Sequence, residues 1–279
     1  MDQLTAGAHA CLTFTDQDER LDLIAAFVAE GLDTRQRVVC LTDAVSAADL
    51  SRELDGRAVG CDSALATGQL RIAEFARTWH DGITAERLLA LVDDELASAG
   101  AAGAPGVRIT ADMGWVTRPG AAAQELIRFE RSLASRAVDN RLTAICQYDR
   151  TIFDPVTLAV TAEVHPEAVA AQVYYEHPLL RICRQYRPPG LRIAGELDFQ
   201  RLDELSLALA ETIRLDHAVD LDLRQLRYID AACAGAITQA AALLPADRQV
   251  TVHCRPLVAK MLTLCGGSGL LRIRATTDA

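Results

Sequence analysis

The turn between the first apolar segment and the first helical segment is rich in carboxylates. Residues 15–20 read Thr-Asp-Gln-Asp-Glu-Arg, so Asp16, Asp18 and Glu19 stand where a nucleotide-binding protein would close its backbone around phosphate. A phosphate-binding loop needs glycines for that close approach and a lysine to reach the terminal phosphate. This turn has neither, and its negative charges repel phosphate. The sequence therefore argues against nucleotide hydrolysis at this position.

Other spacings that carry chemistry are also missing from the sequence. It contains no HExxH, no GxSxG and no GxGxxG segment. The eight cysteines are scattered without a CxxC or CxxxC pair, which argues against a structural zinc site, and we do not expect His9 and Cys11 to form one. We expect no catalytic residues, no bound metal and no cofactor. A binding or signalling protein fits better than an enzyme.

Charge and hydropathy narrow the range of partners. The 279 residues carry 38 acidic against 28 basic side chains, for a net charge of −10. Without a basic stripe, such a chain is repelled by the phosphates of nucleic acid. No stretch approaches the roughly 20 apolar residues that span a bilayer, and the first residues lack the pattern of a secretory signal. We expect a cytoplasmic protein that binds neither nucleic acid nor membrane.

Strand-like and helix-like segments alternate along the whole chain. The first three are a strand at 9–15, a helix at 16–32 and a strand at 37–43. This alternation predicts an α/β fold in which helices cover a parallel sheet. Arg187-Pro188-Pro189-Gly190 interrupts the pattern, because proline removes backbone donors and fixes φ. We place a domain boundary there, which gives domains 1–187 and 188–279.

Open parallel sheets bind ligands beyond the carboxyl ends of their strands. Six residues at such ends or at the edges of other elements form a candidate ligand pocket in the first domain: His9, Asp112, Trp115, Glu130, Tyr148 and His165. The aromatic rings offer flat walls, the carboxylates a directing charge, and the histidines a hydrogen-bonding or pH-responsive group. Core positions for Trp115 and Tyr148, and structural roles for both histidines, remain the alternative.

Two short segments mark the C-terminal part of the chain. Residues 195–198 read Gly-Glu-Leu-Asp, and residues 228–235 carry the pattern YIDxxxxG. Together with the order of elements over 190–279, they resemble the STAS domain of anti-sigma-factor antagonists. In that family the second segment usually reads DSSGxG, and its second serine is phosphorylated by a partner anti-sigma kinase. Here alanine stands at that position.

The resemblance implies a partner-binding and switch segment, formed here by Asp230, Ala231, Ala232, Cys233 and Gly235, whose partner is an anti-sigma factor or a related kinase-fold protein. Because Ala232 has no hydroxyl, we expect no phosphorylation switch at the usual position. Asp230 suits the N-cap of the following helix. Cys233 leaves a redox alternative open, since a helix N-terminus can lower the pKa of a thiol.

Six segments of the N-terminal part occur in a recognisable order: HACLTF at 9–14, EGLxxxxRVVCL at 30–41, RITADMGW at 108–115, FER at 129–131, ICQYD at 145–149 and HP at 165–166. Together they resemble the MEDS domain, a sensory domain of DcmR-type regulators and some sensor histidine kinases. The layout is also similar to a RecA/KaiC-type core that has lost its P-loop. The two resemblances imply a RecA/KaiC-like parallel sheet with flanking helices, followed by a smaller STAS-type α/β domain.

We therefore expect a non-enzymatic bacterial signalling regulator, in which a MEDS-like sensory domain is coupled to a STAS-like output domain that binds an anti-sigma factor or a kinase-fold protein. A small-molecule ligand or a partner at the first domain would replace phosphorylation as the input. The alternatives are a scaffold of a signalling complex and a small-molecule sensor without sigma-factor output. A homo-oligomer is compatible with the sequence.

Overall fold

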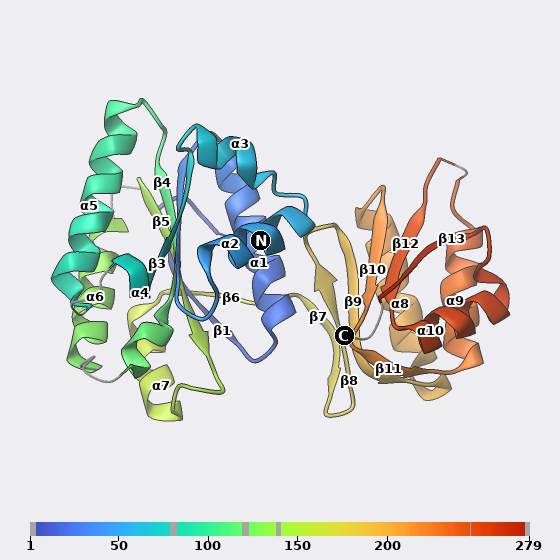
Figure 1. The fold of residues 1–279 in the computed structure, drawn as a ribbon. Coiled ribbons are helices and arrows are strands. Elements are labelled where there is room, and N and C mark those ends of the chain that lie inside the picture. The colour runs from blue at the N-terminus through green and yellow to red at the C-terminus, as the bar shows by residue number, and fades with distance from the viewer. Residues whose placement is uncertain (1–3, 79–82, 119–122, 138–140, 246, 277–279) are drawn as a thin grey trace. The chain divides into compact units, whose positions relative to one another are not determined.

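The computed structural model describes residues 4–78, 83–118, 123–137, 141–245 and 247–276. The chain divides into two compact units, residues 1–170 and 171–279 (Figure 1). This division lies before the predicted boundary at 187/188, because β8 (Leu180–Gln185) pairs antiparallel with β9 (Gly190–Leu197) in the sheet of the second unit. The segment Arg187–Gly190 is thus a turn inside the second unit and not a linker between domains.

The first unit is built on a six-stranded sheet in the order β3-β2-β4-β5-β1-β6, with every pair parallel. Its strands are β1 (His9–Phe14), β2 (Arg37–Thr42), β3 (Leu70–Glu74), β4 (Val107–Asp112), β5 (Leu142–Asp149) and β6 (Glu167–Val169). Its helices are α1 (Gln17–Asp33), α2 (Ala47–Gly56), α3 (Cys61–Ala66), α4 (Phe75–Thr78), α5 (Ala85–Ala101), η1 (Met113–Thr117), α6 (Ala123–Arg136) and α7 (Pro155–Val164). Helices α5, α6 and α7 lie on one face of the sheet, and α1, α2 and α3 lie on the other (Figure 1).

The two central strands of this sheet are buried on both faces. All residues of β4 are buried, as are all of β5 except the last, which is the pattern of a parallel strand covered by helices on both sides. Side chains alternate between the faces of a strand, and the register pairs Cys11 of β1 with Cys146 of β5. His9, Cys11, Cys146 and Tyr148 therefore share one face. Cys11, Cys146 and Tyr148 belong to the same core cluster as Phe129 of α6, so that shared face is the one covered by α6.

The second unit holds a seven-stranded mixed sheet in the order β13-β12-β10-β9-β8-β7, with β11 paired to β9. Besides β8 and β9, its strands are β7 (Val173–His177), β10 (Val219–Leu223), β11 (Leu226–Ile229), β12 (Val250–Cys254) and β13 (Leu271–Ala275). Its helices are η3 (Phe199–Arg201), α8 (Leu202–Leu215), α9 (Ala231–Ala242), α10 (Pro256–Leu262) and η4 (Thr263–Gly267). Strands β7, β8 and β9 form an antiparallel meander, and the remaining pairs are parallel.

One close backbone approach in this sheet requires glycine. A Cβ atom on Gly190 would lie 1.7 Å from the carbonyl oxygen of Asp220, where β9 starts beside β10. Helix α8 packs Leu205, Ala208 and Leu209 into the core, a spacing that places them on one helical face. The glycine and the apolar stripe together hold β9 and α8 in position within the second unit.

The predicted α/β fold class is confirmed: a parallel sheet flanked by helices is followed by a smaller mixed α/β unit. Of the helices in the described part of the chain, none is both long and apolar enough to cross a bilayer.

Candidate functional site

A cluster of polar side chains is buried between the sheet of the first unit and the helices α6 and α7. His9 comes from the first position of β1, Cys146 and Tyr148 from one face of β5, Glu130 from α6, and His165 from the end of α7. Each of these residues is at most 7% exposed. Because polar groups are costly to bury unless they are paired, the contacts within the cluster decide what it can do.

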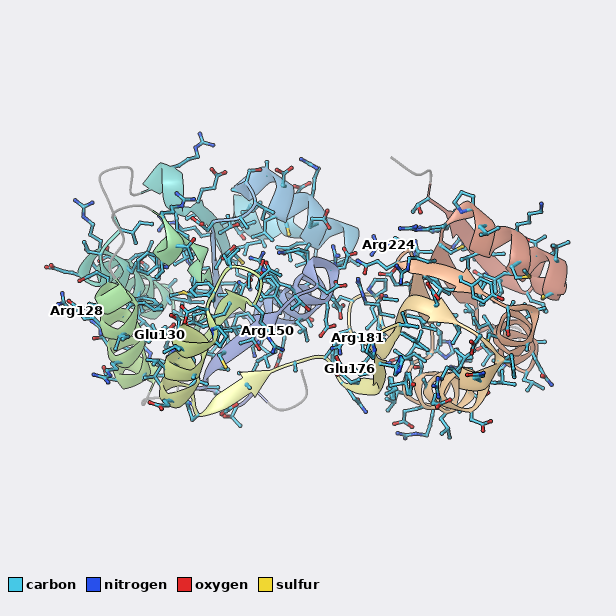
Figure 2. The ribbon with its side chains drawn as sticks, turned by 90° about the horizontal axis from the view of Figure 1, so that it is seen from below. Arg128, Glu130, Arg150, Glu176, Arg181 and Arg224 are labelled. Carbon is cyan, nitrogen blue, oxygen red and sulfur yellow. The ribbon has the colours of Figure 1, made fainter. Side chains whose placement is uncertain are left out.

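Glu130, labelled in Figure 2, contacts each of the other four side chains of the cluster. Its Oε2 atom lies 2.9 Å from His9 Nε2, 3.3 Å from His165 Nε2 and 3.4 Å from Cys146 Sγ. Its Oε1 atom accepts a hydrogen bond from the Tyr148 hydroxyl. The two carboxylate oxygens therefore have different partners. Oε1 contacts Tyr148, and Oε2 contacts the two imidazoles and the thiol.

The cluster fixes the protonation of its members. Burial opposes the charge on Glu130, but the contacts and charges of the His165 and His9 imidazoles outweigh that effect and lower the pKa of Glu130 to about 2. Burial and the charge of Glu130 raise the pKa of Cys146 and of Tyr148 well above their ordinary values. The carboxylate is therefore an acceptor, and the thiol and the phenol are donors.

His165 is oriented from outside the cluster. Its Nδ1 atom lies 2.7 Å from the carbonyl oxygen of Thr161, one turn earlier in α7. A carbonyl oxygen can only accept, so Nδ1 carries the proton, and Nε2 faces Glu130. The rings of His9 and His165 lie side by side, with centroids 4.2 Å apart, and the Tyr148 ring meets the His165 ring edge-on.

Four of the six residues predicted to form the ligand pocket thus meet in this cluster: His9, Glu130, Tyr148 and His165. The prediction missed Cys146, although a two-residue spacing from Tyr148 within one strand places both side chains on the same face. The other two predicted residues lie elsewhere.

Asp112 belongs to a separate buried ion pair. Its Oδ2 lies 2.9 Å from an Arg20 guanidinium nitrogen and accepts a hydrogen bond from the backbone N–H of Ala44 at 3.1 Å. Arg20 in turn donates to Gln147. Asp112 thus ties α1 to the ends of β4 and β5 and is not part of the Glu130 cluster.

Trp115 is completely buried in the core of the first unit. Its ring lies 6.1 Å from that of Phe75, and it is packed in the same hydrophobic cluster as Leu126 and Phe129. The ring is therefore not the exposed wall of a pocket. Trp115 is therefore a core residue, the alternative to a pocket wall.

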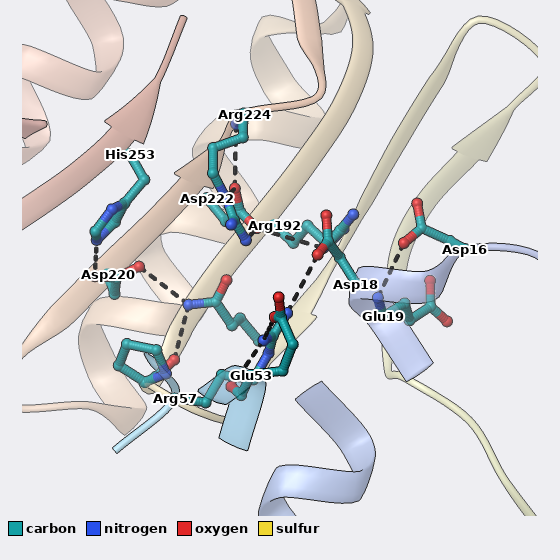
Figure 3. A network of polar contacts seen from close by, with 12 residues as sticks. Asp16, Asp18, Glu19, Glu53, Arg57, Arg192, Asp220, Asp222, Arg224 and His253 are labelled. Atoms are coloured by element: carbon teal, nitrogen blue, oxygen red, sulfur yellow. Dashed lines mark hydrogen bonds and ion pairs between the residues drawn. The ribbon is translucent and has the colours of Figure 1, made fainter. Parts of the chain in front are cut away.

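The acidic turn before α1 serves local structure. Asp16 accepts the backbone N–H of Glu19 at 2.9 Å and caps α1, and Asp18 lies 3.2 Å from the Arg57 guanidinium, which also pairs with Glu53 (Figure 3). Carboxylates suit the positive end of a helix. The same residues that disfavour phosphate thus stabilise the start of α1.

In the second unit, Asp230 joins two segments that are distant in the sequence. One carboxylate oxygen accepts the N–H of Cys233 at 2.9 Å and caps α9, and the other accepts the N–H of Phe199 at 2.7 Å. The predicted N-cap is confirmed. The cap places the first turn of α9 against η3, and the cysteine of η4 reaches the same turn, with Cys265 Sγ 3.7 Å from the carbonyl oxygen of Ala231.

The exposed side chains in the first turn of α9 are apolar and carry no hydroxyl group. Ala231 and Ala232 are exposed, while Phe199 and Leu264 beside them are 65% and 72% exposed. The only hydroxyl within α9 belongs to Thr238, which is buried and donates to backbone carbonyls. We call the four exposed residues Phe199, Ala231, Ala232 and Leu264 the α9 surface.

Cys233 does not have the properties of a reactive thiol. It is buried, and its Sγ donates to the carbonyl oxygen of Asp198 at 3.1 Å. Burial, followed by the charge of Asp230, raises the pKa of the Cys233 thiol to about 12. The redox alternative assumed that the helix N-terminus would favour the thiolate. Desolvation outweighs the helix end here, so the thiol stays protonated.

Two further polar features lie within the second unit. Asp222 contacts Arg224 at 2.7 Å and Arg192 at 3.3 Å, and Asp220 lies 3.0 Å from His253 (Figure 3). A shallow groove of about 570 Å³ runs along the β7–β8 hairpin, with the ion pair of Glu176 and Arg181 at its side (Figure 2).

Comparisons with known proteins identify both units. The family model of the "MEthanogen/methylotroph, DcmR Sensory domain" (MEDS) matches residues 8–166, and that of the "Mlab, STAS domain" matches residues 181–272. No curated protein matches the chain.

Two solved structures are similar in fold. The flagellar accessory protein FlaH from Methanocaldococcus jannaschii shares 7% identity at a TM-score of 0.46, over 66% of this chain and 80% of that chain. A KaiC-like protein from Pyrococcus horikoshii OT3 shares 13% identity at a TM-score of 0.48, over 65% of this chain and 79% of that chain. By its family matches, the chain belongs to the MEDS family and consists of a MEDS sensory domain followed by a STAS domain.

Proposed function

We propose that this protein is a cytoplasmic, non-enzymatic signalling regulator whose STAS domain binds an anti-sigma factor or a related kinase-fold protein through the α9 surface. The observation that carries the proposal is the exposed Ala232 on the first turn of α9, capped by Asp230 and flanked by Phe199 and Leu264. Exposed apolar side chains grouped around a capped helix start suit a protein–protein contact.

The same surface supports control that does not use phosphorylation at this helix. A phosphate on the first turn would add about two negative charges to an apolar contact and weaken it. Ala232 offers no acceptor, and the hydroxyl of Thr238 is buried. The STAS domain would therefore remain competent to bind, and regulation would come from the MEDS domain.

The acidic turn supports a binding role for the first unit over an enzymatic one. Its carboxylates cap α1 and pair with Arg57. They therefore stabilise the turn between β1 and α1, where a nucleotide-hydrolysing protein would bind phosphate.

Capture with the full-length chain tests the proposal. The tagged protein and its Ala232→Asp variant are incubated with lysate of the native cell, and bound proteins are identified by mass spectrometry. We expect a kinase-fold anti-sigma factor that is recovered by the wild type and depleted with the variant. Recovery of other STAS proteins alone, with equal yield from both baits, would contradict the proposal and favour a scaffold.

A further inference from the structure

The buried cluster of the MEDS domain contains a complete set of transition-metal ligands. His9 and His165 offer imidazole nitrogens, Cys146 a sulfur and Glu130 a carboxylate oxygen. Imidazole, thiolate and carboxylate are the donors that Zn²⁺ takes in proteins, usually four at a time in a tetrahedral arrangement. The four residues come from four different elements, so no sequence spacing reveals the set, and this explains why the scattered cysteines predicted no metal site.

Several separations between the donor atoms are close to those in a coordination tetrahedron. With bonds of about 2.0 Å to nitrogen and oxygen and about 2.3 Å to sulfur, neighbouring ligand atoms stand roughly 3.3–3.7 Å apart. In the cluster, His9 Nε2 lies 3.6 Å from Cys146 Sγ, and Glu130 Oε2 lies 3.4 Å from Cys146 Sγ and 3.3 Å from His165 Nε2. The separation of His9 Nε2 and Glu130 Oε2 is shorter, at 2.9 Å, and no pair exceeds 4.8 Å. Small side-chain shifts would suffice to admit an ion.

Contacts outside the donor set orient two of the donors. The carbonyl oxygen of Thr161 accepts the Nδ1 proton of His165, so in the neutral ring that would bind a metal the Nε2 lone pair is directed into the cluster. That Nε2 atom is buried and makes no hydrogen bond of good geometry, although Glu130 is 3.3 Å away. Tyr148 holds Oε1 of Glu130 and leaves Oε2 free to ligate. Carbonyl groups behind histidines and donors behind carboxylates are the usual supports of metal ligands.

Charge balance favours a divalent ion. A thiolate and a carboxylate carry two negative charges, two neutral imidazoles carry none, and a divalent cation makes the whole assembly neutral. A buried site is stable only if its charges are compensated, and all four ligands are at most 7% exposed. Full burial leaves no coordination position open to solvent, as in structural zinc sites.

We propose that His9, Glu130, Cys146 and His165 of the MEDS domain form a closed, four-coordinate site for one Zn²⁺-like transition-metal ion. On binding, the thiol of Cys146 loses its proton to solvent and coordinates as the thiolate. The site lies within one domain, so this proposal stands or falls independently of the partner of the STAS domain.

Metal analysis of the full-length chain gives the first test. The protein is expressed in zinc-supplemented medium, purified without chelator and analysed by mass spectrometry for metals. We expect about one Zn²⁺ per chain, and X-ray absorption should show one sulfur at about 2.3 Å and three nitrogen or oxygen ligands at about 2.0 Å. These measurements use only the wild type, so they do not depend on whether a variant folds.

Cobalt substitution identifies the sulfur ligand. The chain is stripped of metal under reducing conditions, refolded with Co²⁺ and examined by absorption spectroscopy. The wild type and the control Cys40→Ser, a buried cysteine of β2, should show a thiolate-to-cobalt band and tetrahedral visible bands. Cys146→Ser should lose the thiolate band, and Glu130→Gln should bind Zn²⁺ at least about tenfold more weakly in competition with a chromophoric chelator. Circular dichroism confirms that each variant is folded.

Two results would overturn the proposal. The first is a folded wild type without stoichiometric metal that also gives no tetrahedral cobalt spectrum after refolding. The second is an unchanged thiolate band in folded Cys146→Ser, since the sulfur would then come from another of the eight cysteines.

Discussion

Asp230 accepts the backbone N–H of Phe199 at 2.7 Å while it caps α9 through Cys233, so one carboxylate fixes both the start of the helix and the exposed aromatic ring beside it. The α9 surface depends on this arrangement. Without the carboxylate, two backbone donors lose their acceptor, and Phe199 is no longer tied to Ala231 and Ala232.

Replacing Asp230 with alanine should therefore destabilise the STAS domain. Loss of an N-cap costs about 1–2 kcal/mol, and the N–H of Phe199 loses its acceptor as well. Urea unfolding followed by circular dichroism measures the change. The control is Asp247→Ala, which removes only an exposed ion pair with His217 and should leave the unfolding free energy nearly unchanged. Equal unfolding curves for the two variants would contradict the role assigned to Asp230.

Tyr148→Phe should lower the unfolding free energy of the MEDS domain, because Glu130 loses a hydrogen bond. The variant keeps the ring but removes the hydroxyl that donates to Oε1, so a buried carboxylate oxygen loses its partner. Such a loss costs about 1–3 kcal/mol. Tyr228→Phe removes the hydroxyl of a tyrosine that is 49% exposed and serves as the matched control. The prediction fails if both variants unfold at the same urea concentration.

Replacement by alanine should change the stability of the protein in opposite directions at Gly190 and at Gly235. At Gly190 a Cβ would collide with the carbonyl oxygen of Asp220 at 1.7 Å, whereas at Gly235, inside α9, a Cβ would meet no atom within 4 Å apart from its chain neighbours and the backbone of its own helix. We expect Gly190→Ala to cost more than about 3 kcal/mol, and Gly235→Ala to stabilise α9 by up to about 1 kcal/mol because alanine favours the helix. Thermal unfolding of both variants tests the pair, and a tolerated Gly190→Ala would show that β9 and β10 can separate.

The buried carboxylate of Asp222 should make the stability of the STAS domain depend on pH in acid. Burial raises its pKa, but the hydrogen bond and charge of Arg224, together with the charge of Arg192, outweigh burial and lower it below the ordinary value. A folded-state pKa below the unfolded one contributes stability above the unfolded pKa of about 3.9, and this contribution is lost as the pH falls through the folded-state pKa.

Asp222→Asn cannot titrate and should lose less stability than the wild type as the pH is lowered below about 4. Asp203→Asn replaces an exposed carboxylate of α8 and should follow the wild-type curve. Urea unfolding at a series of pH values gives the comparison. Parallel curves for Asp222→Asn and the wild type would contradict the inferred shift.

The alternation of apolar runs and helical periods predicts most of this fold. Helix α1, for example, runs from Gln17 to Asp33, within one residue of the helix expected at 16–32. The hairpin of β7 and β8 is not predicted, because all five residues of β7 are exposed or half-buried and show no period of two. The Pro-Pro-Gly segment is typical of a linker, yet here it turns the chain from β8 into β9. Composition alone does not separate these two uses of proline and glycine.

The Glu130 cluster illustrates the limit for sites. Residue type singles out His9, Glu130, Tyr148 and His165, because histidine, carboxylate and tyrosine side chains can bind a ligand. Their convergence depends on β1 lying beside β5, a pairing of strands that are not consecutive in the chain. The order of strands in the sheet cannot be read from the sequence. Cys146 can be assigned to the cluster only when the pairing of β1 with β5 is known. Trp115, equally prominent in the sequence, lies elsewhere in the core.

The affinity of the partner for Ala232→Asp tests the central claim most directly. The captured kinase-fold protein is titrated calorimetrically with the wild type, with Ala232→Asp, and with Leu243→Asp, which alters an exposed side chain at the other end of α9. We predict that the charge at residue 232 weakens binding at least about tenfold, while the charge at residue 243 changes it less than about twofold. Equal affinities of the wild type and Ala232→Asp would contradict the assignment of the α9 surface as the docking site.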